Sequence, residues 1–327
     1  MEDSRMSAIA ILYILKEHSD EAHPLSSNAC IPLLEQEYDI RINRGTLSAY
    51  IKQLRNFGID IQTTNRGYYL IDRDLEKSEV HVLCNLIHSS HFICDSSSFQ
   101  LIDKLLKTQS RYQRKDFKNA VYIQNSRKTL NRQLFLNVDI LLEAIQKSKM
   151  IQMHYLTYNL KKELIRKRER PYFLHPYYIV EENGNLYLIC KTDKHDDLTH
   201  YRIDRMQDIR KLDTSADALR NSFDPYAYSK TKMYMYSGEP VAVFLRCHKT
   251  ILNDVIDQFG QEIIIQNTKD PDFFIARIFS TETGIIYYAM QYALYCEILE
   301  PSKLRERVKG NLRKALSVYE KERDDDK

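Results

Sequence analysis

Tryptophan is absent from the chain, and only 8 glycines and 8 prolines occur among its 327 residues. So few of these two residues argue against long disordered linkers. No apolar run approaches the ~18 residues that a membrane-spanning helix needs. Residues 1–10 include acids and lack the apolar segment and cleavage site of a signal peptide. We therefore expect a cytoplasmic protein that does not cross a membrane.

Cysteine is scarce and scattered. None of the six cysteines stands in a Cys-x-x-Cys pair, which argues against a disulfide framework and a zinc ribbon and fits a reducing compartment. Cys84, His88, His91 and Cys94 have spacings of four, three and three, and the first three fall within one stripe of a helix. That stripe overlaps the apolar face that bears Val80, and the four side chains cannot converge without a bend, so we expect no metal.

Sequence motifs of enzymes are also missing. The chain has no glycine-rich phosphate loop, no Gly-x-Ser-x-Gly elbow, no His-Glu-x-x-His and no Rossmann fingerprint. Its carboxylates and histidines form no recognisable catalytic spacing. We expect neither catalysis nor a cofactor, and turnover of a nucleotide by the pure protein would overturn this expectation.

Positive charge is concentrated in the middle of the chain, although the net charge is only +3. Residues 104–170 carry 17 Lys and Arg against 5 Asp and Glu, a net charge of +12, whereas residues 1–73 have a net charge of −2. This basic middle is a candidate docking surface for a polyanion. The alternative is an ordinary solvated surface, which charge runs usually form.

The first 72 residues show three helical patterns and then an alternating one. The third helical segment, 45–57, would bury Leu47 and Ile51. Beyond Gly58, apolar and polar residues alternate on both sides of a tight-turn sequence at 64–67. Three helices followed by a two-stranded hairpin are the layout of a winged helix-turn-helix.

A helix of this kind fits the major groove of DNA, where side chains near its N-terminus reach base edges and flanking Arg and Lys hold phosphates. For the groove we predict Arg44, Thr46, Ser48 and Tyr50, and for the phosphate backbone Lys52, Arg55 and Arg66. A winged helix can instead serve as a protein-interaction module, and the net negative charge of this segment favours that alternative.

Between the hairpin and a later strand-rich segment lie three further helical patterns: 75–92, 96–108 and 137–147. We expect them to form a helical bridge over 73–148 that connects the domains and holds a dimer together. From Met150 onward the pattern changes to short alternating strands. About five such strands over 149–213 predict a small, curved, SH3-like β-barrel.

The strand-rich segment carries several motifs that resemble a known family. They are Tyr155, Pro176, the triplet Leu186-Tyr187-Leu188 and the block Tyr201-Arg202-Ile203-Asp204-Arg205-Met206. These look like the motifs of the WYL-domain family of bacterial transcription regulators, and the resemblance extends over nearly the whole chain. Where the family has its name-giving tryptophan this chain has Leu186, which puts a stacking role there in doubt.

The resemblance implies that the barrel senses a nucleotide or nucleic-acid ligand in a basic, aromatic pocket. Arginine guanidinium groups fork onto phosphates, and tyrosine rings stack on bases or donate a hydroxyl. The residues that we assign to this pocket are Tyr155, Tyr187, His200, Arg202 and Arg205. The alternatives are that Tyr187 packs in the barrel core and that Arg205 pairs with Asp204 or Asp208.

Residues 241–327 show a strand–helix–strand–strand–helix order, followed by a final helix from Ser302. This order predicts a small ferredoxin-like α+β domain. The stretch Leu299-Glu300-Pro301 before the last helix resembles the C-terminal extension of WYL regulators. We expect this domain to contribute to dimerisation.

The sequence thus predicts a multi-domain α+β transcription regulator. Its parts are a winged helix-turn-helix (1–72), a helical bridge (73–148), an SH3-like sensor barrel (149–213), a linker (214–240) and a ferredoxin-like extension (241–327). Its expected partners are double-stranded DNA, a nucleotide or nucleic-acid ligand, and a second copy of the chain. The alternative is a non-regulatory nucleic-acid-binding module that acts through the basic middle, in which case deletion of residues 1–72 would change little.

Overall fold

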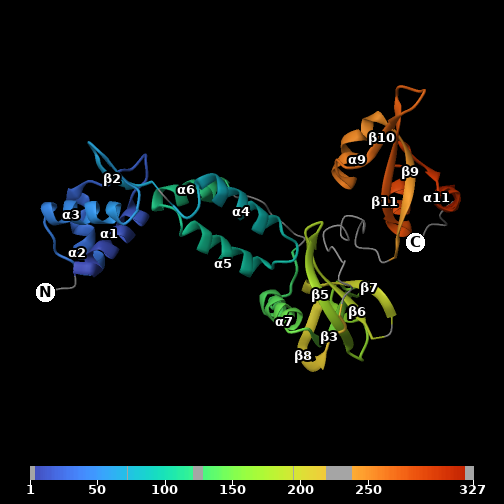
Figure 1. Ribbon diagram of the computed structural model, residues 1–327, viewed down its shortest axis with the longest axis horizontal. Coiled ribbons are helices and arrows are strands. Elements are labelled where there is room, and N and C mark those ends of the chain that lie inside the picture. Colours follow the sequence, from blue (N-terminus) through green and yellow to red (C-terminus); the bar gives the residue numbers. More distant parts are fainter. Residues whose placement is uncertain (1–3, 72, 121–127, 194, 219–237, 321–327) are drawn as a thin grey trace, which may run out of the picture. The chain divides into compact units, whose positions relative to one another are not determined.

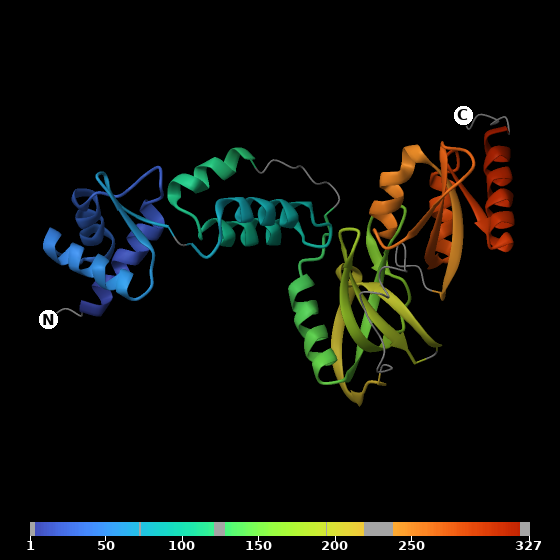
Figure 2. The same ribbon diagram turned by 45° about the horizontal axis from the view of Figure 1, so that its top comes forward.

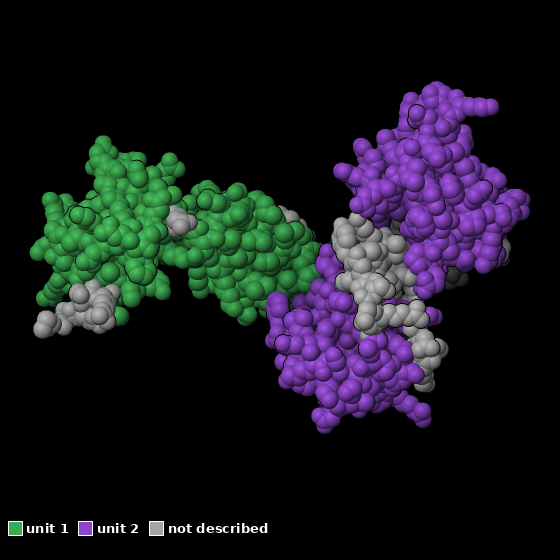
Figure 3. Space-filling view, viewed as in Figure 1, with its two compact units in different colours: residues 1–132 green, residues 133–327 purple. Residues whose placement is uncertain are grey.

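The structure is a computed structural model that divides the chain into two compact units, residues 1–132 and residues 133–327 (Figure 3). It describes the following residues: 4–71, 73–120, 128–193, 195–218 and 238–320. Helices dominate the first unit, whereas the second contains two antiparallel sheets with helices packed on them. The chain is therefore a multi-domain α+β protein, as the sequence predicts.

Three helices open the first unit (Figure 1). They are α1 (Ser4–His18), α2 (Ser27–Tyr38) and α3 (Arg44–Asn56). Each contributes an apolar stripe to a shared core, in which Ile14, Leu34 and Ile51 are buried. The side chains of Ser26 and Asn43 cap α2 and α3, because each accepts a backbone N–H from the first turn of its helix. These caps fix where both helices begin.

A two-stranded hairpin, β1 (Ile61–Thr64) and β2 (Gly67–Leu70), follows α3. Tyr68 in this hairpin also exchanges two backbone hydrogen bonds with Leu25, which lies just before α2, at 2.7 and 2.9 Å. Gly67 has a φ of 139°, and a Cβ atom at this position would lie 2.3 Å from the carbonyl oxygen of Leu25. Since only glycine permits both this φ and so close an approach, Gly67 fixes the hairpin against the chain segment before α2.

Three further helices complete the first unit: α4 (Lys77–Ser89), α5 (Asp95–Leu106) and α6 (Arg111–Ala120). The sequence predicts the first two. It does not predict α6, because this segment is almost entirely polar and lacks an apolar stripe. The buried anchor of α6 is Phe117, which packs with Val80 and Cys84 of α4.

Polar contacts join α1 to the segment that leads into α6. Asp20 is only 6% exposed, and its carboxylate accepts hydrogen bonds from Ser110 Oγ at 2.6 Å and His23 Nδ1 at 2.8 Å. The guanidinium of Arg73 donates to three backbone carbonyls, two at the end of α1 and one at Thr108, over 2.7 to 3.1 Å. These buried hydrogen bonds fix the first three helices to the bridge helices.

The second unit begins with what we call the central sheet domain, residues 134–215. Its elements are α7 (Leu134–Gln146), β3 (Lys149–Tyr158), β4 (Leu164–Arg166), β5 (Tyr172–Glu182), β6 (Asn185–Thr192), β7 (His195–Arg202), the 3₁₀ turn η1 (Ile203–Arg205) and β8 (Met206–Ser215). The strands follow the order β4-β3-β5-β6-β7, and β8 returns to pair with β3. Whereas the sequence assigns residues 137–147 to the helical bridge, α7 packs on this sheet (Figure 2).

Two strands of this domain differ from the sequence expectation. The block from Tyr201 to Met206, expected as one strand, is broken by η1, where Ile203 and Asp204 turn inward and are buried. The chain then continues as β8, which the sequence does not predict because its residues are mostly polar.

The second part of this unit is what we call the C-terminal sheet domain, residues 240–320. Its elements are β9 (Pro240–His248), η3 (Lys249–Ile251), α9 (Leu252–Phe259), β10 (Ile264–Asn267), β11 (Phe273–Thr281), α10 (Glu282–Gln291), β12 (Cys296–Glu300) and α11 (Ser302–Glu320). The strands are antiparallel in the order β10-β11-β9-β12. The sequence did not predict β12. Of the expected linker 214–240, residues 219–237 lie outside the described residues.

The helices of the C-terminal sheet domain cover one face of its sheet. Val243 and Leu245 of β9 and Ala276 and Ile278 of β11 point into a core that also contains Ile285 of α10. Because strand side chains alternate between faces, the residues between these apolar ones lie on the opposite face. None of the helices in the described ranges is long and apolar enough to cross a membrane.

Candidate nucleic-acid interface and ligand site

The outer face of α3 presents a stripe of exposed polar side chains. Arg44, Ser48 and Lys52 are exposed and four residues apart, so they lie on one line along the helix, beside its buried face. Gly45 and Ala49 beside them are exposed as well. Such small residues allow the backbone of a helix to approach a partner closely, a signal that the sequence carries but that our prediction did not use.

Three other predicted DNA contacts have packing roles. Thr46 belongs to the helix cap, since its backbone N–H and its hydroxyl donate to Asn43 Oδ1 at 2.9 and 3.1 Å. The ring of Tyr50 is half-buried against the helical core. Arg55 is directed toward the hairpin, where its Nε donates to the carbonyl oxygen of Ile61 at 2.6 Å. These contacts engage part of each side chain inside the protein, and the assignment of the three residues to DNA stays a prediction.

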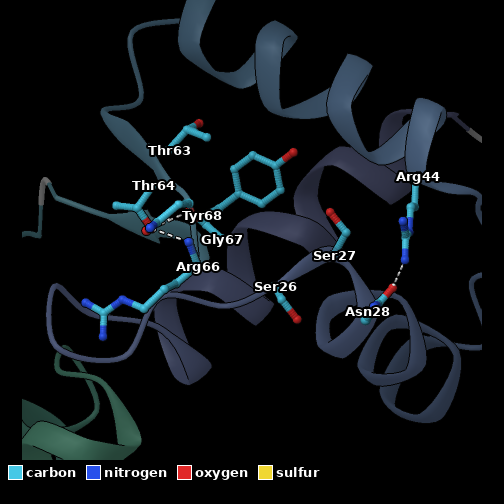
Figure 4. Close-up of a pocket in the computed structure, with 10 residues that line it drawn as sticks. Ser26, Ser27, Asn28, Arg44, Thr63, Thr64, Arg66, Gly67 and Tyr68 are labelled. Carbon is cyan, nitrogen blue, oxygen red and sulfur yellow. Dashed lines mark hydrogen bonds between the residues drawn. The ribbon is translucent and has the colours of Figure 1, made fainter.

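An open hollow of about 280 Å³ lies between the start of α2, the start of α3 and the hairpin. Arg44 and Arg66 lie at opposite ends of the group of side chains that line it, and Arg44 donates a hydrogen bond to Asn28 (Figure 4). The N-terminus of α2, with Ser26 and Ser27, also borders the hollow. Two guanidinium groups and the positive end of a helix favour an anion such as a phosphate group.

The hollow contains residues that our sequence analysis missed. Ser26, Asn28 and Thr64 were assigned to a helix start and a turn, with no role in binding. They come from segments about forty residues apart, which the backbone bridge between Leu25 and Tyr68 brings together. No local pattern in the sequence signals this contact.

Many cations of the basic middle have partners inside the chain. Their pairs include Arg114 with Glu17, Lys107 with Asp103 at 2.7 Å, Lys147 with Glu143 at 2.6 Å and Arg166 with Asp208 at 3.0 Å. Partnered cations contribute less to the field that attracts a polyanion. This observation reduces the support for a module that binds nucleic acid chiefly through residues 104–170.

Lys128 in the basic middle stabilises the segment that connects α4 to α5. Its ammonium donates to the carbonyl oxygens of Ile87, Ser90 and Ile93 at 3.0 to 3.2 Å and to Ser98 Oγ at 2.8 Å. Burial lowers the pKa of Lys128, while the nearby Asp95 and Cys94 oppose this effect. The side chain is thus a structural cation that is not available to DNA.

The central sheet domain brings together four of the five predicted ligand residues. Tyr187 on β6 lies directly opposite Arg202 on β7. The backbone N–H of Arg202 donates to the hydroxyl of Tyr155 at 3.4 Å, and its guanidinium forks onto Asp204 at 3.0 and 2.8 Å. Asp204 is only 3% exposed, so it holds Arg202 in a fixed orientation. Of the pairings open to Asp204, the structure shows the one with Arg202, which the sequence analysis did not consider.

Further aromatic rings and two more arginines extend this group. Tyr201 makes edge contacts with Tyr155 and Tyr172, at ring-centre distances of 5.0 and 5.4 Å. Arg168 lies 3.4 Å from the ring centre of Tyr172, and Arg205 lies 5.5 Å from that of Tyr158. Arginine stacked on tyrosine is an arrangement that also accepts bases and phosphates. The sequence did not assign Tyr172 and Tyr201 to the site.

Tyr155, Tyr187 and Arg202 keep their ordinary charge states at neutral pH. Burial raises the pKa of Tyr155 and of Tyr187, so both stay protonated and keep a hydroxyl donor. For Arg202, burial lowers the pKa, but the hydrogen bonds to Asp204 outweigh it and the net shift is upward. The fifth predicted residue, His200, lies two positions before Arg202 on β7, and its Nδ1 is buried.

Cys84 and Cys94, weighed as metal ligands in the sequence, lie in different surroundings. Cys84 is buried in the core below α4, whereas the thiol of Cys94 contacts the hydroxyls of Ser96 and Ser97 at the start of α5. Across the described ranges, three or more His, Cys, Asp or Glu side chains are nowhere grouped so that they could hold a metal ion.

Comparisons with known proteins place one family on the central sheet domain: residues 137–211 match the WYL domain. No curated protein sequence matches the chain. Among solved structures, the chain is similar to proteasome accessory factor B/C (PafBC) of Arthrobacter aurescens, with 13% identity and a TM-score of 0.29. That alignment covers 97% of this chain and 49% of the other, so the chain spans about half the length of that protein.

A second solved structure, described as a CRISPR Cas-related protein, is 18% identical with a TM-score of 0.38. The alignment covers 96% of this chain and 85% of the other. Both structural likenesses are weak. The match of residues 137–211 to the WYL domain and the chain's own residues therefore carry the functional argument.

Proposed function

We propose that the chain is a cytoplasmic transcription regulator that binds specific double-stranded DNA through a winged helix-turn-helix. The observation that carries this proposal is the exposed stripe Arg44, Ser48 and Lys52 on α3, which continues into the hollow bordered by Arg66. A helix with short polar and basic side chains can read base edges, while the hollow takes a backbone phosphate. A protein-interaction module would not need two arginines at the ends of this open hollow.

The WYL match supports the second part of the proposal, a ligand sensor in the central sheet domain. The ligand would be a nucleotide or a nucleic acid, because Arg202 and Arg205 supply phosphate contacts next to the rings of Tyr155 and Tyr187. Binding would alter operator affinity only if the ligand prefers one arrangement of the protein over another. We infer a homodimer, in which two copies of α3 reach successive turns of the groove.

The finer fold assignments belong to the same proposal. The strand order β10-β11-β9-β12, with its two crossover helices, supports a ferredoxin-like C-terminal domain. The return of β8 to β3 supports a small curved barrel of the SH3-like kind for the central sheet domain.

A binding titration tests the proposal. The full chain is titrated against a labelled duplex from upstream of its own gene and against a scrambled duplex of the same length, at several salt concentrations. We expect a preference of about 10³ or more for the native duplex. In the double variant Arg44→Ala/Lys52→Ala the preference should fall by at least tenfold. Equal, steeply salt-dependent affinities for both duplexes would refute sequence-specific regulation.

A matched control separates a lost contact from a general loss of charge. Arg41 belongs to the same domain and is exposed, but it pairs with Glu35 and lies before α3, outside the exposed stripe. The variant Arg41→Ala should therefore keep the preference for the native duplex.

For the sensor, Arg202→Ala/Arg205→Ala should abolish any response of operator binding to mononucleotides or short oligonucleotides and leave operator binding itself intact.

A further inference from the structure

The face of the C-terminal sheet that the helices leave uncovered carries an ordered set of side chains, which we call the open sheet face. Its residues on the two central strands are Phe244, Arg246 and His248 on β9 and Phe273, Arg277 and Phe279 on β11. They alternate with the buried residues of the same strands, so all six point away from the core. Phe279 is 53% exposed, which is unusual for so large an apolar side chain.

Aromatic and basic groups alternate across this face. The strand register places Phe273 opposite His248 and Arg277 opposite Phe244. The guanidinium of Arg246 lies 3.7 Å from the ring centre of Phe273, and that of Arg277 lies 5.8 and 5.6 Å from the rings of Phe244 and Phe279. Along the strand direction, Phe244 lies level with Arg277, four residues from Phe273 and two residues from Phe279. The rings thus offer flat surfaces at spacings of about 14 and 7 Å, with a cation beside each.

The charges of the open sheet face leave room for an anionic partner. The carboxylates nearest to Arg246 belong to Asp270 and Glu297, at 3.6 and 3.9 Å, and Glu297 is also held by Arg305. In the part of the chain that the structure describes, Arg277 has no ion pair with a carboxylate. Two weakly neutralised guanidinium groups between three phenylalanines would attract phosphates to a surface on which bases can stack.

We propose that the open sheet face binds single-stranded nucleic acid, by stacking bases on Phe244, Phe273 and Phe279 and holding phosphates with Arg246 and Arg277. An uncovered four-stranded sheet with aromatic residues on its strands is a geometry on which two or three unpaired bases stack. A duplex does not fit this surface, because its bases are already stacked on one another. The site is separate from α3 and from the Arg202 cluster, and so it adds a second nucleic-acid contact to the proposed regulator.

The absence of tryptophan from the sequence gives a direct test. The variant Phe279→Trp places a single indole on the open sheet face and preserves a stacking ring. Addition of a short oligothymidylate or oligouridylate to the full chain should quench its fluorescence, while a duplex of the same length should not. No quenching by either single strand would overturn the proposal.

Alanine variants test the contribution of the rings and the charge. Phe279→Ala and Arg277→Ala should each weaken binding of a labelled oligothymidylate, measured by fluorescence anisotropy, and loss of the ring should cost roughly 5- to 100-fold. Tyr319→Ala is the matched control, because Tyr319 is an 88% exposed aromatic of the same domain on α11, away from this face. Equal affinities of Phe279→Ala and Tyr319→Ala would overturn the proposal.

Two further readouts separate this site from the other candidates. The variant Arg202→Ala/Arg205→Ala, combined with Phe279→Trp, should retain the quenching, whereas its loss would place the single strand in the central sheet domain. Sedimentation of Phe279→Ala should match that of the unmodified chain. A shift to a smaller species would instead identify the open sheet face as a contact between two copies and would refute nucleic-acid binding there.

Discussion

Individual basic side chains in this protein differ in whether they are free at the surface or hydrogen-bonded inside the protein. Lys52 and Arg66 are exposed, whereas Arg55 is bonded to the hairpin and Lys128 to three backbone carbonyls. A count of lysines and arginines therefore overstates what is available to DNA. The sequence reveals the charge of each side chain but not the partner that neutralises or orients it, as the Arg202–Asp204 pair shows.

Removal of the buried carboxylate tests that pair. In Asp204→Asn the fork onto Arg202 is lost and a buried polar group loses its charged partner, so we expect the free energy of unfolding to fall by about 1–3 kcal/mol. Urea denaturation measures the change. Asp208→Asn is the control, since this carboxylate is exposed and its pair with Arg166 should contribute less than about 1 kcal/mol. Equal effects of the two substitutions would contradict a special role for Asp204.

Asp20 leads to a prediction about acid stability. Burial alone would raise the pKa of this carboxyl, but hydrogen bonds from Ser110 and His23 outweigh it and hold the pKa below its ordinary value of 3.8. A depressed carboxyl pKa contributes stability that is present above the unfolded-state pKa and is lost as the pH falls through the folded-state pKa. Asp20→Asn should therefore destabilise the first unit at pH 7, by about 1–3 kcal/mol.

The pH dependence distinguishes this explanation from simple damage to packing. The difference in unfolding free energy between the unmodified chain and Asp20→Asn should shrink as the pH falls below about 4, because both then lack the charge. Thermal denaturation at a series of pH values measures it. A difference that stays constant down to the acid limit would show that the charge of Asp20 contributes nothing.

At the scale of elements, sequence reasoning succeeded where an apolar stripe is present. The helices α1 to α5, α7 and α9 to α11 all have apolar residues at helical spacing, and the hairpin has a clear turn. It failed for α6, β8 and β12. In α6 Phe117 is a buried anchor among mostly polar residues, and in β8 most residues are polar too. The packing or pairing of both elements is decided by distant segments.

The candidate site follows the same rule. The stripe on α3 could be predicted because it lies within one helix, whereas the contacts that Thr46 makes with the helix cap and Tyr50 with the core could not be read from the sequence. The hollow could not be predicted, because it joins the starts of two helices to a hairpin. In the central sheet domain the family motif located Tyr155 and Arg202, but the contribution of Tyr172 depends on strand pairing.

The hairpin provides a prediction at this scale. Gly67→Ala forces a Cβ atom against the backbone of Leu25, so it should destabilise the protein by more than about 1 kcal/mol and weaken binding to the native duplex. Gly58→Ala is a matched control, because Gly58 also has a positive φ of 99° but no atom lies within 4 Å of the place that a Cβ would occupy. Thermal denaturation and anisotropy compare the two. If both variants behave alike, the close approach to Leu25 has no consequence.

For the whole molecule, the two surfaces that we propose for nucleic acid, α3 with its hairpin and the open sheet face, lie in different compact units. The salt dependence of duplex binding tests the first surface, α3 with its hairpin. Each phosphate contact that is removed lowers the slope of log affinity against log salt by roughly 0.9. Arg66→Ala should reduce the slope for the native duplex by about this amount, whereas Ser48→Ala should reduce the preference over the scrambled duplex and leave the slope unchanged. Identical slopes for Arg66→Ala and the unmodified chain would exclude Arg66 from the phosphate contact.

The backbone bridge between Leu25 and Tyr68 has a consequence for recognition. Hairpins at the edge of a domain are usually loose, and a loose hairpin has to be ordered by the DNA that it meets. Here the hairpin is already ordered in the free protein, because it is hydrogen-bonded to the segment before α2, and Arg55 of α3 is hydrogen-bonded to it. DNA binding therefore does not lose the entropy of ordering it. In the proposed complex, α3 and the hairpin therefore bind the duplex in an arrangement that folding has already fixed, and the affinity gained in this way should appear mainly as a slow dissociation rate.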